Sequence, residues 1–253
     1  MSSSGQDQYQ ADRLRILHWN IHSWRDGSGA SNLDCVIDLI HASDPHVVSL
    51  VEVDEPWKAA SSLDKLADRC GYSSIFTPSF EFGQETPAGG FGNALLTKLP
   101  IVTVRQRHLV WPPKIYDGTE PSEPRTVVLA KLRHSSQLFW MGSVHLPRND
   151  PDTRNDALHR LVALTEGLDD QWLVCGDFNT PASSWLHHYR SVTMCPVPAQ
   201  ATYPADQPVE PIDYCIASPG VITKANVLLT SGSDHLPIIV FSQLAGTVMG
   251  CGR

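Results

Sequence analysis

Short apolar runs recur along the whole chain, and their length limits what the chain can fold into. Apolar runs of about four to eight residues bounded by turn residues are typical of buried strands. Segments with helical spacing, such as 32–41 and 154–168, are few and lie between these runs. Because sheets and helices each bury an apolar face, this mixture predicts an α/β fold of two packed sheets covered by helices. The expected strands are 13–19, 46–51, 72–77, 93–97, 101–109, 127–132, 138–144, 172–175, 212–217, 221–229 and 237–242.

Segments rich in proline and glycine separate many of these elements. Such residues favour turns and loops over regular structure. Three of these segments are long enough to surround a binding site, and two further amphipathic stretches predict helices. The expected long loops are 78–92, 111–124 and 196–211, and the additional helices are 57–70 and 182–189.

The size and charge of the chain limit its organisation and its partners. With 253 residues and 42% hydrophobic residues, the chain can bury one sizeable core. We expect a single domain over 13–243, a disordered tail over 1–12 and a C-terminal tail over 244–253. The formal charge is −8, whereas proteins that bind nucleic-acid backbones usually carry a basic face. The acidic total therefore disfavours a general nuclease, although a local basic groove stays compatible with it.

The sequence also predicts where the protein works. It has no apolar run long enough to span a membrane. Its first ten residues are polar and lack the apolar core of a signal peptide. We therefore expect a cytoplasmic monomer that does not associate with membranes.

The six cysteines do not predict a metal or redox motif, because none of them forms a CxxC pair. Cys175 and Cys215 lie inside apolar runs, where a free cysteine behaves as a small buried hydrophobe. A cysteine nucleophile is the alternative, and no neighbouring residue supports it.

Polar side chains follow several apolar runs at the point where a strand should end. Asp177 and Asn179 follow one run, and Asp234 and His235 follow another. Polar groups at the ends of adjacent strands can converge on one crevice. Oxygen ligands suit a hard metal ion and histidine can transfer a proton at phosphate, so the pattern predicts a metal-assisted hydrolase. The other strand-end residues of this kind are Asn20, Glu52, His145 and Asp213.

Eight short motifs carry a resemblance to a known family. They are WNIH (19–22), LVE (50–52), GNALLTK (92–98), PRTV (124–127), GSVHL (142–146), GDFN (176–179), IDY (212–214) and SDH (233–235). In this order they resemble the endonuclease/exonuclease/phosphatase superfamily, over about residues 13–243. The resemblance implies the DNase I-like fold, a four-layered α/β sandwich of two mainly antiparallel β-sheets flanked by α-helices.

The resemblance also implies a metal site. Glu52 would bind a divalent metal, with Asn20 and Asp234 near the same ion. A small set of hard oxygen ligands suits Mg²⁺, which keeps several waters, with Mn²⁺ as the alternative. His22 stands where some relatives have an aspartate that joins the metal site. Because histidine is a poorer Mg²⁺ ligand, we assign His22 to the substrate side and leave the number of metals open.

The remaining motif residues are implied to carry the reaction. Asp177 would orient or deprotonate the attacking water, and Asn179 would hold it and the phosphate. His235 would bond the phosphate in the transition state, with Asp213 as its orienting partner. His145 would contact the scissile phosphate, either as an acid for the leaving oxygen or as a charge stabiliser.

Substrate contacts are expected from residues beside these motifs. Arg125 stands where relatives place a phosphate-contacting basic residue, and Arg148 follows His145 closely. Tyr203, in the 196–211 loop, could stack on a base or line an apolar pocket. The other histidines have no motif support and are interpreted as structural or solvated. They are His18, His41, His46, His108, His134, His159, His187 and His188.

The leading hypothesis is a phosphoesterase that hydrolyses a phosphodiester or phosphomonoester by in-line attack of an activated water. Acidic residues in the long loops would repel a long polyanion, so a small or locally contacted substrate is favoured. A DNA or RNA nuclease, or a DNA-repair phosphodiesterase, is the alternative within the superfamily. A hydrolase of a non-phosphate ester in specialised metabolism and a non-catalytic binding relative are the alternatives from other classes.

Overall fold

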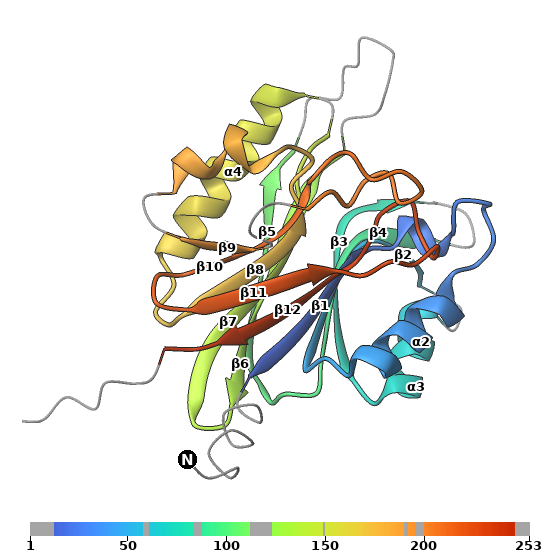
Figure 1. The fold of residues 1–253 in the computed structure, drawn as a ribbon, viewed down its shortest axis with the longest axis horizontal. Coiled ribbons are helices and arrows are strands. Elements are labelled where there is room, and N and C mark those ends of the chain that lie inside the picture. Colours follow the sequence, from blue (N-terminus) through green and yellow to red (C-terminus); the bar gives the residue numbers. More distant parts are fainter. Residues whose placement is uncertain are drawn as a thin grey trace, which may run out of the picture.

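Two six-stranded β-sheets packed face to face form the centre of the molecule (Figure 1). The computed structural model describes residues 13–57, 61–82, 88–111, 123–148, 150–189, 192–195 and 200–245. In spatial order the first sheet contains β11 (Ile222–Val227), β12 (Ile238–Gln243), β1 (Leu14–Asn20), β2 (Val47–Pro56), β4 (Gly89–Thr97) and β3 (Ser73–Phe82). The second contains β5 (Ile101–Val110), β6 (Arg125–His134), β7 (Gln137–His145), β8 (Trp172–Asp177), β10 (Asp213–Ala217) and β9 (Thr193–Cys195).

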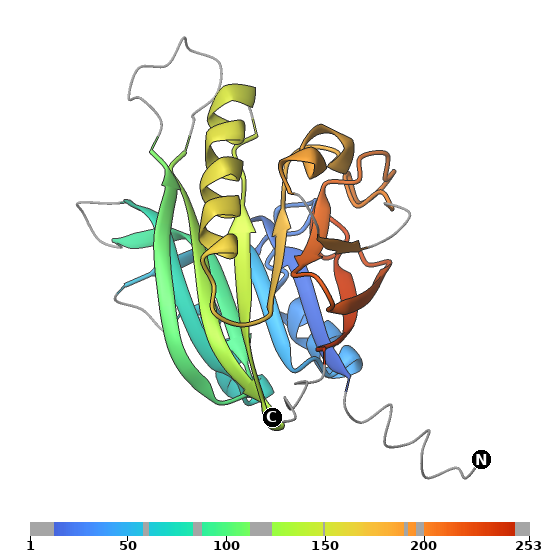
Figure 2. The same cartoon turned by 90° about the vertical axis from the view of Figure 1, so that its left-hand side faces the viewer.

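Helices cover the outer faces of the two sheets. Helices α2 (Leu33–Ser43) and α3 (Ser62–Cys70) pack on the first sheet, and α4 (Pro151–Glu166) packs on the second (Figure 2). Among the described strands, the parallel pairs are β1–β2 in the first sheet and β7–β8 in the second. The other pairs are antiparallel. The predicted four-layered sandwich of mainly antiparallel sheets is therefore confirmed.

Alternation along the strands decides which side chains face the space between the sheets. In β1, Leu14 and Ile16 belong to the core between the sheets, whereas Leu17 and Trp19 belong to the core under α2 and α3. Successive side chains of a strand point to opposite faces. His18 and Asn20, the next positions of the inner set, therefore face the second sheet, and Asn20 ends the strand.

The same alternation operates in the second sheet. Leu173 and Cys175 of β8 face the core between the sheets, so Asp177 at the end of β8 faces inward as well. Cys175 and Cys215 are both buried there, directly opposite each other on β8 and β10. The expectation that these cysteines are buried is therefore confirmed.

Several predicted element boundaries are wrong, each for a local reason. The segment 78–92 is not one long loop, because β3 runs on to Phe82 and β4 begins at Gly89. Pro78 fits within β3 because β3 is an edge strand, where a missing amide donor is tolerated. The helix predicted from 57 begins only at Ser62, where the Ser61 side chain accepts a hydrogen bond from the Asp64 amide.

Further differences concern short elements. Residues 182–189 form two 3₁₀ turns, η2 (Ala182–Ser184) and η3 (Leu186–His188), and not one α-helix. The short strand β9 is absent from the prediction. Most of the predicted loop 111–124, the predicted tail 1–12 and residues 246–253 of the second predicted tail lie outside the described residues. The second tail does not begin at Leu244 as predicted, because Leu244 is buried in the core between the sheets. Among the helices that the structure describes, none is long and apolar enough to cross a membrane.

Candidate active site

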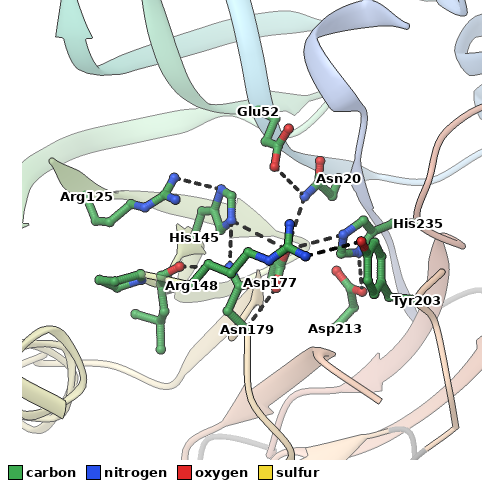
Figure 3. A network of polar contacts seen from close by, with 12 residues as sticks. Asn20, Glu52, Arg125, His145, Arg148, Asp177, Asn179, Tyr203, Asp213 and His235 are labelled. Carbon is green, nitrogen blue, oxygen red and sulfur yellow. Dashed lines mark hydrogen bonds and ion pairs between the residues drawn. The ribbon is translucent and has the colours of Figure 1, made fainter. Parts of the chain in front are cut away.

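The twelve residues predicted for the site meet at one end of the sandwich, where a continuous network of hydrogen bonds, ion-pair contacts and ring contacts joins them. Figure 3 labels all of them except His22 and Asp234. Both sheets contribute to it, because the inner faces of β1, β2, β7 and β8 end there and those of β6 and β10 begin there. The twelve are Asn20, His22, Glu52, Arg125, His145, Arg148, Asp177, Asn179, Tyr203, Asp213, Asp234 and His235.

Asp177 lies at the centre of this network and is almost completely buried. Its Oδ1 accepts a hydrogen bond from the backbone amide of Asn179 at 2.8 Å, and its Oδ2 accepts one from Asn20 Nδ2 at 3.1 Å. Nε2 of His145 and Nε2 of His235 lie 3.5 and 3.7 Å from the same Oδ2. Burial, together with the charge of Asp213, raises the pKa of Asp177 to about 7. The carboxyl can therefore gain and lose a proton near neutral pH.

Glu52 reaches the network because β2 is irregular at this point. Leu50 and Val53 both face the helix-covered core, although they are three residues apart. The register with β4 shifts between them, and Glu52 has a φ of +56°. A bulge of this kind changes the phase of the alternation. As a result Glu52 turns to the inner side, where its Oε1 accepts a hydrogen bond from Asn20 Nδ2 at 3.0 Å.

Asn20 holds two carboxylates with one amide group. Its Oδ1 accepts a hydrogen bond from the His22 backbone amide at 3.1 Å, which fixes the orientation of the side chain. Its Nδ2 consequently points at Glu52 and Asp177, from opposite sheets. The two carboxylates that accept from this amide lie close together, and carboxylate oxygens are ligands that suit a hard divalent cation.

Asp234 and His22 lie beside Asn20, on the outer side of the site. Ser233 connects this loop to β1, because its hydroxyl donates to the Asn20 carbonyl at 2.7 Å. His22 Nδ1 lies 3.8 Å from Asp234 Oδ1. His22, Ser23 and Trp24 all have positive φ, a conformation that non-glycine residues rarely adopt and that surrounding contacts must hold.

His235 is fixed by Asp213 across the space between the sheets. His235 Nδ1 lies 2.9 Å from Asp213 Oδ2, and the Thr202 hydroxyl donates to the same oxygen at 2.5 Å. Burial alone would lower the pKa of His235, but the carboxylates of Asp213 and Asp177 raise it to about 10. The imidazole is therefore a cation at neutral pH, with Nε2 directed toward Asp177.

His145 differs from His235 in its charge. Its Nδ1 accepts a hydrogen bond from Arg125 Nη1 at 3.1 Å, because a guanidinium can only donate. Burial and the Arg125 charge hold the pKa of His145 well below its ordinary value. The imidazole is thus neutral and carries its proton on Nε2, which lies 3.5 Å from Asp177 Oδ2. Arg125 itself is buried, with an additional contact to Glu123 at 3.2 Å.

Tyr203 and Arg148 form the outer edge of the site (Figure 3). The Tyr203 ring lies over His235 with a centroid separation of 4.7 Å. The Arg148 guanidinium lies over the Tyr203 ring, 5.6 Å from its centroid. Arg148 Nη2 donates to the Tyr203 hydroxyl at 3.4 Å. The segment that carries Tyr203 is tied to the Asp234 loop, since the Ala205 amide donates to the Asp234 carbonyl at 2.7 Å.

Two partners of Asp213, Thr202 and His18, were missed by the sequence prediction. His18 has no motif support, yet its Nε2 lies 3.4 Å from Asp213 Oδ1 and its side chain is completely buried. The available signal was its place on the inner set of β1, two residues before Asn20. Asp177, Asp213 and His235 are also close enough together to hold a metal ion. Their closeness is already explained by the contacts of His235 with the two carboxylates.

Comparison with solved structures shows that other proteins share this fold. An endonuclease/exonuclease/phosphatase from Beutenbergia cavernae has a TM-score of 0.71 at 20% identity, covering 93% of this chain and 72% of that chain. The human nocturnin catalytic domain with bound sulfate has a TM-score of 0.70 at 20% identity, covering 93% and 94%. A mannosyl-6-phosphatase from Bacteroides thetaiotaomicron has a TM-score of 0.71 at 16% identity, covering 91% and 100%. At these identities the likeness concerns the fold.

The sequence itself gives the family. No curated protein matches the chain. The family model described as Endonuclease/Exonuclease/phosphatase family matches residues 17–235, which is most of the chain. The chain therefore belongs to the endonuclease/exonuclease/phosphatase family, whose members are generally metal-dependent phosphoesterases.

Proposed function

We propose that this protein is a divalent-metal-dependent phosphoesterase that hydrolyses a phosphate ester by in-line attack of water. The observation that carries the proposal is the arrangement around Asp177. One buried carboxyl with a pKa of about 7 is contacted by two asparagines and faces one neutral and one cationic histidine. A proton acceptor, a cation and neutral donors within one small volume are the groups that phosphoryl transfer requires.

The metal would be held by Glu52 and Asp234, with Asn20 aligning Glu52. The oxygen-rich set supports Mg²⁺, with Mn²⁺ as the alternative. When bound, the ion would neutralise charge on the phosphoryl oxygens. The protein's own contribution is the Asn20 amide, which holds the Glu52 carboxylate at 3.0 Å.

Each remaining residue has a separate role in this proposal. Asp177 accepts the proton of the attacking water, and the Asn179 side chain orients the phosphate. His235, as a cation held by Asp213, donates from Nε2 to a phosphoryl oxygen. A neutral His145 is a weak acid, so the Arg125 contact supports a charge-stabilising role and disfavours protonation of the leaving oxygen.

We propose a small or locally contacted phosphodiester or phosphomonoester as the substrate. The formal charge of −8 disfavours a long polyanion. Arg148 and Tyr203 at the outer edge offer one cation and one aromatic ring, which suits a substrate group next to the phosphate. His22 would contact the substrate from the Asp234 side. The monomeric state stays a prediction.

The test is a substrate panel assayed with Mg²⁺, with Mn²⁺ and with EDTA. It contains para-nitrophenyl phosphate, bis-para-nitrophenyl phosphate, plasmid DNA and a set of small phosphate esters. We expect metal-dependent hydrolysis of at least one small ester. Asp177→Asn should lower the turnover rate by about 10²-fold or more. Preferential cleavage of the plasmid would support the nuclease alternative. Absence of turnover on every phosphoester would contradict the proposed function.

A further inference from the structure

His18 is a buried titratable residue with no place in the proposed reaction. It lies on the inner face of β1, one layer below the active site, between the apolar Ile16 and the active-site Asn20. Its side chain is fully buried, and an imidazole in such a position costs free energy unless its nitrogens find partners. The contacts of its two ring nitrogens therefore indicate why a histidine stands there.

The first nitrogen is anchored within the core. Nδ1 of His18 lies 3.0 Å from the hydroxyl of Ser49 on the parallel neighbour β2. The Ser49 hydroxyl lies 2.8 Å from the Ser143 hydroxyl of the second sheet, and the Ser143 hydroxyl lies 3.3 Å from the Leu50 carbonyl. This row of polar contacts joins the two sheets directly beneath the site and fixes the plane of the His18 ring.

The second nitrogen faces the carboxylate that orients His235. His18 Nε2 lies 3.4 Å from Asp213 Oδ1, within ion-pair distance. Asp213 Oδ1 and His18 Nε2 are both buried and make no other hydrogen bond among the described residues. A carboxylate oxygen can only accept, and two buried acceptors facing each other would repel. His18 Nε2 must therefore carry a proton.

This contact has a consequence for the position of His235. Thr202 and His235 both bond Asp213 Oδ2, the oxygen on one side of the carboxylate (the Asp213–His235 contact is drawn in Figure 3). The terminal torsion of an aspartate has a broad minimum, so contacts to one oxygen leave the plane of the group free to turn. A donor at Oδ1 removes this freedom. His18 is the group placed to supply it.

We propose that His18 is a positioning residue, which donates Nε2–H to Asp213 and thereby fixes the carboxylate that orients His235. The predicted effect of His18 on turnover rests on the proposed function, whereas the predicted proton on His18 Nε2 does not. The competing explanation is that His18 only fills space in the core. Space filling predicts that side chains of similar size are equivalent and that the proton position has no bearing on His235.

The first test needs no activity. In ¹⁵N-labelled protein, long-range ¹H–¹⁵N NMR correlations report which ring nitrogens of each histidine carry a proton. We expect a protonated Nε2 on His18 and a strongly deshielded Nδ1 proton on His235. A bare Nε2 on His18 would overturn the proposal, whether or not the protein hydrolyses any phosphoester.

The second test compares two substitutions that separate the two nitrogens. Glutamine can place an amide donor where Nε2 stands, whereas asparagine can replace only Nδ1 and its contact to Ser49. We expect His18→Asn to lower kcat by about 10- to 100-fold, with KM little changed, as loss of an orienting partner does. His18→Gln should recover most of this loss and retain the deshielded His235 proton.

A control variant separates positioning from general disturbance of the core. Cys175 lies on the inner face of β8, and among the described residues its side chain makes no hydrogen bond with His18 or Asp213. Cys175→Ala should lower thermal stability and leave kcat within about twofold. Equal losses in His18→Asn and His18→Gln, or no loss in either, would overturn the proposal. If both variants fail to fold, the NMR measurement on the unaltered protein still decides it.

Discussion

Asn20 of β1 and Asp177 of β8 belong to different sheets, and Asn20 Nδ2 donates to Asp177 Oδ2 over 3.1 Å. The same Nδ2 donates to Glu52 over 3.0 Å. A single amide therefore joins two carboxylates that would otherwise repel each other. The candidate site is a junction between the sheets, so its geometry depends on how closely they pack.

Asn20→Asp tests this junction with almost no change of shape. The substitution replaces a donor by a third carboxylate, so Glu52 and Asp177 lose their shared partner. We expect the free energy of unfolding to fall by about 1–3 kcal/mol in EDTA, the usual cost of leaving buried acceptors unpaired. Added Mg²⁺ should restore much of it. Chemical denaturation with and without Mg²⁺ measures the effect, and an unchanged stability in EDTA would argue against the bridging role.

Glu52→Gln should remove the stabilisation that Mg²⁺ gives to the folded protein. A ligand at about 100 times its Kd stabilises a folded protein by about 2.7 kcal/mol, so Mg²⁺ should raise the Tm of the unaltered protein. The substitution keeps the size of Glu52 but removes the charge that would hold the ion. We expect the Mg²⁺-dependent rise to disappear, as measured by differential scanning fluorimetry. A full rise in Glu52→Gln would remove this residue from the metal site.

Asp213→Asn should separate the charge of the orienting residue from its shape. The carboxylate keeps His235 cationic, and an amide would remove that charge at the 2.9 Å contact. We expect kcat to fall by about 10²–10⁴-fold, as seen when an aspartate beside a catalytic histidine becomes asparagine. Thr202→Val removes only one hydrogen bond to Asp213 and should cost about tenfold or less. A similar fall in kcat in the two variants would contradict the prediction that the Asp213 charge matters more than the Thr202 hydrogen bond.

Gly176 is expected to be indispensable for packing beside the site. A Cβ at this position would lie 2.4 Å from Cγ1 and 2.4 Å from the carbonyl oxygen of Val144 on β7. Backbone of the neighbouring strand cannot move aside cheaply, so Gly176→Ala should destabilise the fold by about 1–3 kcal/mol or more. Gly27→Ala is the matched control, because an added Cβ there meets nothing within 4 Å. Urea denaturation of both variants measures the difference.

His46 should make stability depend on pH far from the active site. Its Nδ1 accepts a hydrogen bond from the Arg15 amide at 2.9 Å, which requires an unprotonated nitrogen. Burial and the Arg15 charge lower the pKa of His46 from 6.5 to about 4. Between these values the unfolded chain binds the proton and the folded protein does not, so stability falls as the pH drops from 6.5 to about 4.

His46→Asn isolates this contribution. Asparagine can offer an oxygen acceptor in place of Nδ1 and does not titrate. We expect the variant to lose less stability than the unaltered protein over the same pH interval, while the two respond alike above pH 7. Thermal melts at a series of pH values compare them. Parallel curves throughout would show that His46 does not resist protonation in the folded state.

Sequence patterns were sufficient for the layers and for the polar side chains at the strand ends. Alternating apolar runs that end in Asn20, His145 or Asp177 are local features, and both the strands and their polar ends follow from them. The boundaries failed where local signals mislead. Pro78 resembles a loop residue but stands in an edge strand, where a missing amide donor is tolerated.

What the sequence by itself determined is the order of the polar residues along the chain and the fold family that this order implies. Tertiary structure alone decided that β2 bulges to turn Glu52 inward, that Arg125 is buried against His145, and that His18 reaches Asp213 across the sheets. The physical reason is that these contacts join residues distant in sequence. Periodicity predicts which face of a strand a side chain occupies, whereas the partner on the opposite sheet depends on packing.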